Sequence, residues 1–155
     1  MVIDTTGSRV GISDSVGGGF ILLSACVHRV MFTLDELAST SDVLFDPNEV
    51  DVYYSNGQDG SAGLIDINTQ ETYEMTLVDG RGVLLSSPSR SMDGHFIYVS
   101  NNNSGEVYSL NAYSKTIHKT FKVDRIPARF YTIPEGIFWY FLNKNTKRFI
   151  SYQQN

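Results

Sequence analysis

The sequence predicts a single all-β domain built from tandem repeats, and three observations carry this prediction. A Tyr-x-x-Asn pattern recurs three times at nearly constant spacing. The 155 residues include nine Tyr, nine Phe and thirteen Gly, a composition typical of strands joined by tight turns. Short alternations of apolar and polar residues are separated by clusters of Asn, Asp and Gly. Apart from one possible turn at 33–38, no segment has a helical pattern.

The repeated pattern lies at Tyr53–Asn56, Tyr98–Asn101 and Tyr140–Asn143, and the Asn residues are 45 and then 42 positions apart. Four residues before each Tyr is a turn position, namely Glu49, Gly94 and Gly136. Ten residues after the first two Asn, a second turn opens at Asp66 and at Asn111. A period of roughly 40–50 residues is typical of β-propellers. We expect each Tyr to fill a layer between sheets and each Asn to cap a turn.

Each complete repeat divides into four strands, which in the third repeat are expected at 82–87, 96–100, 106–110 and 116–123. The repeats extend approximately over 8–40, 41–80, 81–124 and 125–155. We place the first repeat by Gly18, by 22–25 and by Asp35, and expect it to lack its outer strand. The last repeat stops after its third strand. The sequence therefore predicts about three and a half to four blades, each a four-stranded antiparallel sheet.

The Tyr-x-x-Asn strand and its flanking turns resemble the YVTN family of β-propeller repeats over about residues 18–153. Tyr98-Val99-Ser100-Asn101 differs from the motif of the family's name at one position, whereas Tyr140-Phe141-Leu142-Asn143 keeps only the two ends. The family includes surface proteins of archaea and bacteria, subunits of amine dehydrogenases and relatives of sugar lactonases. The resemblance implies a propeller fold and favours a cell-surface or periplasmic location, but it selects no function.

Completion of the ring is the main structural question, because propellers have four to eight blades. The chain could close on itself with residues 2–5 completing the last blade, two chains could form one ring, or the chain could belong to a longer propeller. Residues 1–114 carry a net charge of −11 and residues 115–155 a net charge of +6. An acidic beginning that faces a basic end suits either kind of closure, and we favour a homodimer.

Catalytic and metal-binding patterns are absent from the sequence, so we expect no catalytic residue, metal or other cofactor. His28, His95 and His118 are far apart in sequence and are interpreted as structural or surface residues. Cys26 follows an apolar run and is expected to be a buried, unreactive thiol. The acidic segments 46–51 and 58–61 could offer oxygen ligands to calcium, but turn capping explains them better.

Loops at one mouth of the channel are the candidate ligand site, since propellers usually bind there. These loops carry two acids and three arginines: Asp79, Arg81, Asp124, Arg125 and Arg129. Guanidinium groups suit an anionic ligand such as a carboxylate or a phosphate. The same residues could instead form a ring of ion pairs that neutralise one another.

The leading functional hypothesis is a non-enzymatic binding or assembly module that engages a small anionic ligand or a protein partner. The alternatives are a lactonase-like or other hydrolytic propeller enzyme with a site at the channel mouth, and a fragment of a longer propeller. The net charge of −5 disfavours nucleic acid as a partner. No segment reaches the ~20 apolar residues of a membrane span, and the first residues lack a signal-peptide pattern, so we expect no membrane association.

Overall fold

The structure, a computed structural model, describes residues 1–155 except 36, 38–39, 47, 58, 79–84, 87, 92, 124–126, 133–137, 144–148 and 154–155. For residue 41 and for the strands between 127 and 153 it describes the backbone alone. Every regular element in the described part is a β-strand. Among these residues, no helix is long and apolar enough to cross a membrane.

The strands form four antiparallel sheets, here called blades 1 to 4, and each is a meander in chain order. Blade 1 consists of β1 (Val2–Ile3), β2 (Arg9–Asp14), β3 (Gly19–Ser24) and β4 (Arg29–Leu34). Blade 2 consists of β5 (Thr40–Phe45), β6 (Asp51–Asn56), β7 (Ser61–Asp66) and β8 (Thr72–Thr76). Blade 3 consists of β9 (Ser89–Arg90), β10 (Phe96–Asn101), β11 (Glu106–Asn111) and β12 (Thr116–Lys122). Blade 4 contains β13 (Pro127–Thr132), β14 (Phe138–Asn143) and β15 (Phe149–Gln153).

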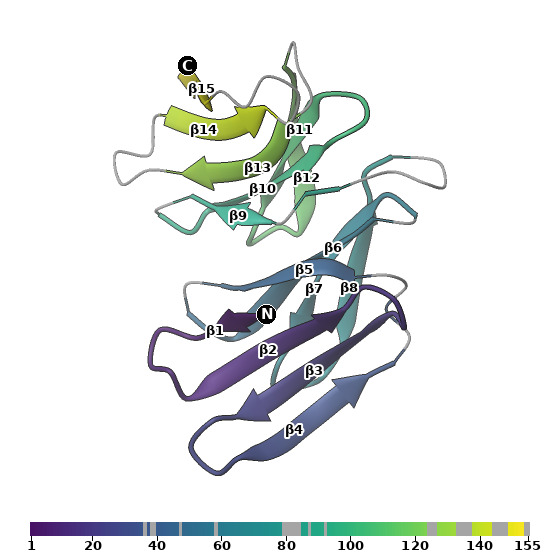
Figure 1. Cartoon of the computed structure of the whole chain (residues 1–155), viewed down its shortest axis with the longest axis vertical. Helices are drawn as coiled ribbons and strands as arrows, with labels where there is room; N and C mark the ends of the chain where they lie inside the picture. The colour runs from purple at the N-terminus through teal and green to yellow at the C-terminus, as the bar shows by residue number, and fades with distance from the viewer. Residues whose placement is uncertain are drawn as a thin grey trace.

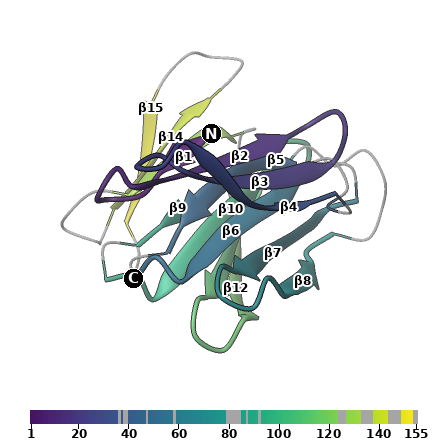
Figure 2. The same cartoon turned by 90° about the horizontal axis from the view of Figure 1, so that it is seen from below.

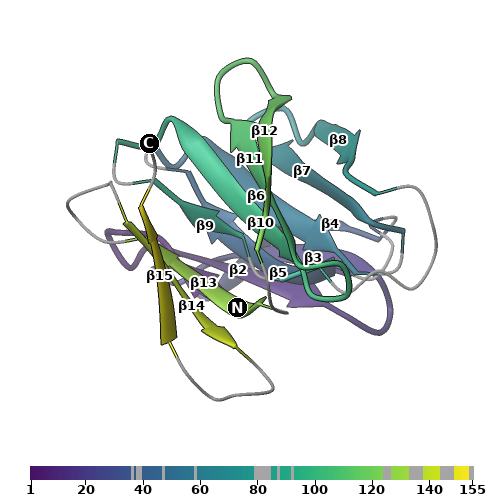
Figure 3. The same ribbon diagram turned by 90° about the horizontal axis from the view of Figure 1, so that it is seen from above.

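The blades follow one another in space in the same order as in the chain (Figure 1). Strands β1 and β2 lie against β5, and β9 and β10 lie against β13. The fourth strands β4, β8 and β12 are mostly exposed, whereas the second and third strands of blades 2 and 3 are almost entirely buried. Figure 3 shows blade 4 at one end of this stack. The predicted all-β fold of four-stranded antiparallel blades is therefore confirmed.

Three kinds of turn repeat at intervals of 42 and 45 residues, each with a residue of positive φ at a fixed place. Between the first and second strands these residues are Gly7, Glu49 and Gly94. Between the second and third strands they are Gly18, Gly60 and Gly105. Between the third and fourth strands they are His28, Gln70 and Lys115. The first three blades are thus built on one template.

Side chains cap these turns, as the sequence predicted. The Oδ1 atom of Asn101 accepts hydrogen bonds from the backbone N–H groups of Asn103 and Ser104, at 2.9 and 3.2 Å. Asp66 caps its own turn in the same way at 2.8 and 3.0 Å. Asn111 caps the equivalent turn of blade 3 with two bonds of 2.9 Å. Carboxylate and amide oxygens supply the acceptors that tight turns leave open.

Apolar layers between the blades hold the fold together. The layer between blades 1 and 2 contains Phe20, Leu22, Leu37, Val43, Phe45, Val52, Tyr54, Ile65 and Ile67. The layer between blades 2 and 3 contains Tyr53, Ala62, Leu64, Leu85, Ile97, Val99, Tyr108 and Leu110. Tyr98 packs with Val107 and Val123 on the opposite face of blade 3. The prediction that the Tyr residues of the repeat fill layers between sheets is confirmed for Tyr53; Tyr98 is buried, but its described contacts lie within blade 3.

Blade 1 corrects the prediction for the first repeat. It has all four strands, and β1 pairs with β2 rather than with the last blade. The strand equivalent to β6 and β10 is β2, so the motif position is 11–14 and not 22–25. Gly11 stands there in place of the Tyr, because the Phe20 ring and Val2 already occupy that space: a Cβ on Gly11 would lie 3.1 and 3.2 Å from their nearest atoms.

Cys26 is a second correction. It lies in the turn between β3 and β4 and is exposed, not buried. The apolar run that suggested burial ends with β3 at Ser24, two residues earlier. The thiol therefore projects from a turn, where no sheet covers it.

Candidate functional site

Blade 1 and blade 2 are joined at their first turns by an ion-pair cluster around Arg9. Arg9 Nε donates to Asp4 Oδ2 at 2.9 Å, and its Nη2 donates to Glu49 Oε2 at 3.0 Å. Its Nη1 also donates to the carbonyl oxygen of Glu49 at 2.9 Å. Burial raises the pKa of Asp4, but the hydrogen bonds from Arg9 and Ser8 outweigh it and hold the pKa well below its usual range. The cluster is a structural clamp, since its groups are all paired.

The outer face of blade 1 is apolar and only partly covered. Cross-strand pairing places Val10 beside Leu23 and Ile12 beside Ile21 on this face, and all four side chains are half-buried. Ile3 and Val30 continue it and are 56% and 50% exposed. Figure 2 looks at the molecule from this side and shows blade 1 in front.

The equivalent faces of blades 2 and 3 are completely buried. Leu23 corresponds to Ile65 and Leu110, which are 0% and 2% exposed. Val10 corresponds to Val52 and Ile97, which are 0% and 1% exposed. These equivalent residues pack against the preceding blade in each case. Blade 1 thus presents the same kind of face without a described blade in front of it.

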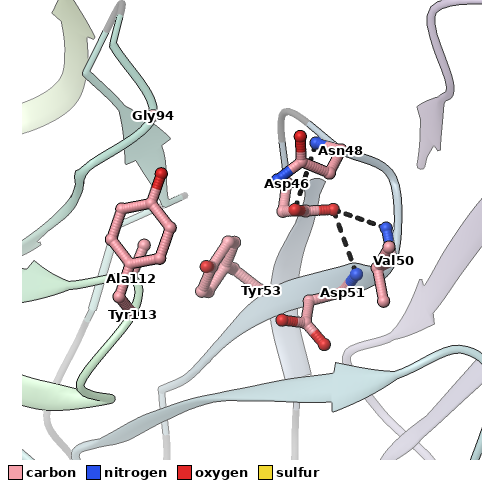
Figure 4. Close-up of a pocket in the computed structure, with 8 residues that line it drawn as sticks. All are labelled: Asp46, Asn48, Val50, Asp51, Tyr53, Gly94, Ala112 and Tyr113. Atoms are coloured by element: carbon pink, nitrogen blue, oxygen red, sulfur yellow. Dashed lines mark hydrogen bonds between the residues drawn. The ribbon is translucent and has the colours of Figure 1, made fainter.

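A pocket of about 260 Å³ opens between blades 2 and 3, at the end of the sheets where the first turns lie. It is called the interblade pocket here (Figure 4). Its lining residues are Asp46, Asn48, Val50, Asp51, Tyr53, Gly94, Ala112 and Tyr113. Tyr53 lies between the acidic turn of blade 2 on one side and Tyr113 of blade 3 on the other (Figure 4).

The two carboxylates of the interblade pocket have different surroundings. Asp46 accepts hydrogen bonds from the backbone N–H groups of Asn48, Val50 and Asp51, at 3.1, 2.7 and 3.0 Å. This confirms the turn-capping interpretation of segment 46–51. The Asp51 carboxylate has no hydrogen bond or ion pair with a described residue. Burial raises the pKa of Asp51; Lys115 opposes this rise, and the charges of Asp46 and Asp66 add to it.

Tyr53 is 4% exposed, and its hydroxyl has no hydrogen-bond partner in the described part of the chain. Burial, together with the charges of Asp51 and Asp46, raises its pKa far above the usual range. The group is therefore a neutral phenol at physiological pH. It can accept a hydrogen bond from a ligand or donate one.

The predicted channel-mouth site is mostly not described. Asp79, Arg81, Asp124 and Arg125 lie outside the described residues. Arg129 lies in β13, where its backbone pairs with Leu142, and its side chain is not described. The anion-binding cluster stays a prediction. Within the described residues, no group of three or more His, Cys, Asp or Glu side chains could hold a metal ion.

The interblade pocket was missed at the sequence level, although segment 46–51 forms one of its walls. The other wall comes from Gly94 and from the turn at 112–113, which lies more than 60 residues after this segment. One signal was present. In a four-stranded meander, the turn after the third strand lies at the same end of the sheet as the turn after the first strand. Because the turns at Asp66 and Asn111 are equivalent, the turn at 112–113 in blade 3 and the turn at 46–50 in blade 2 had to lie at the same end of their sheets. Combining that placement with the contact between blades 2 and 3 would have brought the two turns together.

No protein-family model matches the sequence, and no curated protein matches it. Solved structures do. The hydrazine synthase of Kuenenia stuttgartiensis aligns with 97% of this chain at a TM-score of 0.85 and 14% identity, over 44% of its own length. The β-propeller domain of Myceliophteria thermophila Cps50 (Swd1) aligns with 99% at a TM-score of 0.78 and 9% identity, over 50% of its length.

A third similar structure is the dihydro-heme d1 dehydrogenase NirN in complex with DHE. It aligns with 99% of this chain at a TM-score of 0.74 and 16% identity, over 33% of its own length. The chain thus spans a third to a half of the proteins it resembles. Identities this low show the fold alone. The chain has a β-propeller fold.

Proposed function

We propose that the chain is a non-enzymatic assembly and binding module of the YVTN β-propeller type, which forms about half of a closed ring. The observation that carries this proposal is the half-covered outer face of blade 1. Its residues match positions that are buried against a preceding blade in both blade 2 and blade 3. Burying one such side chain fully contributes on the order of 1.5–3 kcal/mol, so the face gains by receiving another blade.

A second copy of the chain is the occupant we favour. Two copies of four sheets give eight blades, which is within the usual range of four to eight. A head-to-tail arrangement brings blade 4 of one copy against blade 1 of the other, twice around a two-fold axis. Residues 115–155 carry a net charge of +6, whereas the net charge of −11 of residues 1–114 lies beyond blade 1, since residues 1–34 hold two acids and two arginines. The basic end of one copy is therefore attracted to the acidic middle of the other over a longer range than the seam itself.

The sequence predicted that the first repeat lacks its outer strand, but the structure has that strand as β4, and β1 belongs to blade 1. The proposed pairing therefore does not depend on a missing strand. The pairing depends on the apolar face and on the charges. An alternative occupant is the rest of a longer propeller. It is favoured by the coverage of 44%, 50% and 33% of the similar structures.

Light scattering at low micromolar concentration tests the proposal. A second copy gives about twice the chain mass of 17.3 kDa, and raised salt weakens the pair because part of the attraction between the two copies is electrostatic. Leu23→Lys places a charge in the seam and shifts the mass towards one chain. Ile117→Lys is the control, because it also adds a lysine at an exposed apolar position, 43% exposed, but on the outer strand of blade 3.

A stable, cooperatively unfolding monomer over this concentration range contradicts pairing with a second copy. A monomer that aggregates, and that becomes soluble with Leu23→Lys, favours the longer propeller as the source of the missing blades. Equal effects of Leu23→Lys and Ile117→Lys would show that the outer face of blade 1 has no special role.

A further inference from the structure

The interblade pocket does not depend on completion of the ring, because both of its described walls belong to this chain. Blade 2 supplies the turn at Asp46 and the start of β6, and blade 3 supplies Gly94 and the turn at Ala112 and Tyr113. Its volume of about 260 Å³ is slightly below the usual range for drug-sized ligands. A group the size of one amino-acid side chain fits it.

The lining is acidic and aromatic. Among the described lining residues, Asp46 and Asp51 are the ionisable acids, Tyr53 and Tyr113 are the aromatic residues, and none is basic. Asp46 is committed to its own turn through three backbone N–H groups. Asp51 has no such partner in the described part of the chain, so its carboxylate is the one left for a ligand. Carboxylates form their strongest hydrogen bonds with charged donors.

Tyr53 places a polar group where a ligand can reach it. The residue is 4% exposed, and its hydroxyl, which has no partner among the described residues, is not one of their buried unpaired polar atoms, so it opens into the pocket. A ligand with several N–H donors can bond to the Tyr53 hydroxyl and to the Asp51 carboxylate, which both line the pocket. The Tyr113 ring, 66% exposed at the rim, offers a face to which a cation is attracted.

We propose that the interblade pocket binds an organic cation of side-chain size, an alkylammonium or guanidinium group. Its N–H donors bind the Asp51 carboxylate and the Tyr53 hydroxyl, and its alkyl part lies against the tyrosine rings. Such a group occurs on a free amine and on a Lys or Arg side chain of a protein partner. The chemistry is the same in both cases.

Next to the pocket, the chain itself contains an ammonium group that lies against a tyrosine ring. Lys115, in the turn after Tyr113, places its Nζ 3.8 Å from the centre of the Tyr73 ring in blade 2. Its charge acts on Asp51 and on Asp66, although no ion-pair contact forms with Asp51. An ammonium group already lies on the aromatic and acidic surface beside the pocket. It also competes with a bound cation for Asp51.

The test is an NMR titration of the 155-residue chain with n-butylammonium chloride, followed through the ring signals of Tyr53 and Tyr113. The matched probe is n-butanol, which has the same alkyl chain without a charge, and sodium chloride controls for ionic strength. We expect n-butylammonium to shift both rings and n-butanol to have little effect. Equal effects of the two probes would overturn the proposal, because the pocket would then be merely apolar.

Three variants sharpen the test. Asp51→Asn removes one charged acceptor and weakens n-butylammonium binding about tenfold. Asp66→Asn makes the same change of net charge nearby, outside the pocket lining, and changes the affinity less than about twofold. Lys115→Met removes the competing charge and strengthens binding about twofold. Gain of affinity in one variant and loss in another exclude unfolding as the common cause.

Equal weakening by Asp51→Asn and Asp66→Asn would overturn the proposal, because binding would then depend on overall charge. If Asp51→Asn does not fold, Tyr113→Leu replaces it, since the exposed Tyr113 ring can be removed without loss of core; it is expected to weaken binding roughly threefold. A capped peptide with one Lys distinguishes the two sources. Tighter binding of the peptide than of n-butylammonium indicates a protein partner, and equal binding indicates a free amine.

Discussion

Among the glycines whose surroundings the structure describes, Gly63 leaves the least room for a Cβ atom. It lies in β7, directly opposite Tyr54 on β6 and Glu74 on β8. A Cβ atom added to Gly63 would lie 2.3 Å from the carbonyl oxygen of Tyr73 and 2.7 Å from the hydroxyl oxygen of Tyr54. The nearest obstacle is a backbone atom of the neighbouring strand, so no side-chain rotation relieves the contact. Gly63→Ala must therefore push β7 and β8 apart.

The expected cost follows from these contacts. Overpacking a well-packed site costs typically 1–3 kcal/mol, and we place Gly63→Ala near the top of this range, at about 3 kcal/mol, because two contacts are far below van der Waals distance. The Tyr54 ring cannot move away easily, since it is 1% exposed in the layer between blades 1 and 2. For a chain of this size, that cost lowers the melting temperature by roughly 6–12 °C.

Thermal unfolding followed by circular dichroism measures this effect, with Gly7→Ala as the matched control. Gly7 has a φ of +72°, and a Cβ added there would meet no atom within 4 Å. Gly7→Ala therefore lowers the free energy of unfolding only by the strain of alanine in a left-handed backbone conformation, about 1 kcal/mol. The expected decrease is then roughly 2–4 °C. Equal decreases in the two variants, or an unchanged melting temperature for Gly63→Ala, would refute the steric argument.

Two further predictions concern charged groups. The melting temperature of the chain should decrease once the pH is lowered below about 4. Backbone N–H groups lower the pKa values of Asp14 and Asp66, and the stabilisation given by a carboxylate of lowered pKa is lost as it becomes protonated. Equal melting temperatures at pH 7 and pH 3 would contradict this. Arg9→Met should lower the free energy of unfolding, measured in urea, by about 2–3 kcal/mol, because it leaves the buried Asp4 with fewer partners. The control Arg29→Met, at an exposed position, should lower it little. Equal losses in the two variants would refute the role of Arg9 as a clamp.

The middle of the chain was predictable because its repeats keep their turn residues. Strands expected at 96–100 and 106–110 are observed as β10 and β11, each one residue longer. Asn101 and Asn111 each end a strand, and the Oδ1 atom of each accepts hydrogen bonds from the N–H groups two and three residues further on, as a short side chain with an acceptor does in a turn. Turn chemistry is local, so the sequence alone carries it.

The first repeat was misplaced because its defining side chain comes from another strand. At the Tyr position stands Gly11, and Phe20 of β3 fills the space instead. The apolar run of β3 then resembled the motif strand more closely than β2 did. Packing between strands is not local, and a pattern search along the chain cannot recognise that a ring has been supplied from the neighbouring strand.

The interblade pocket could not be predicted for a related reason. Each of its walls is an ordinary capped turn, and only the packing of blade 3 against blade 2 turns the two into a pocket. The channel-mouth arginines are the reverse case. The sequence suggested a binding site there from the residue types alone, but most of these residues lie outside the described part of the chain, so the site remains a prediction.

One backbone position shows how equivalent blades acquire different chemistry. The first residue of the second strand is Arg9 in blade 1, Asp51 in blade 2 and Phe96 in blade 3. In each blade its carbonyl oxygen accepts the same hydrogen bond from the start of the preceding turn, at 3.1, 2.9 and 2.8 Å. The fold uses the backbone of this residue and leaves its side chain free to vary.

The side chains at this position have different partners. Arg9 is held by Asp4 and Glu49, and the ring of Phe96 lies 4.9 Å from that of His118. Asp51 has neither kind of contact within the described part of the chain, and burial raises its pKa, so its charge is costly inside the interblade pocket. A bound cation would remove that cost. For this reason the cation site is expected at blade 2, although all three blades share the same turn.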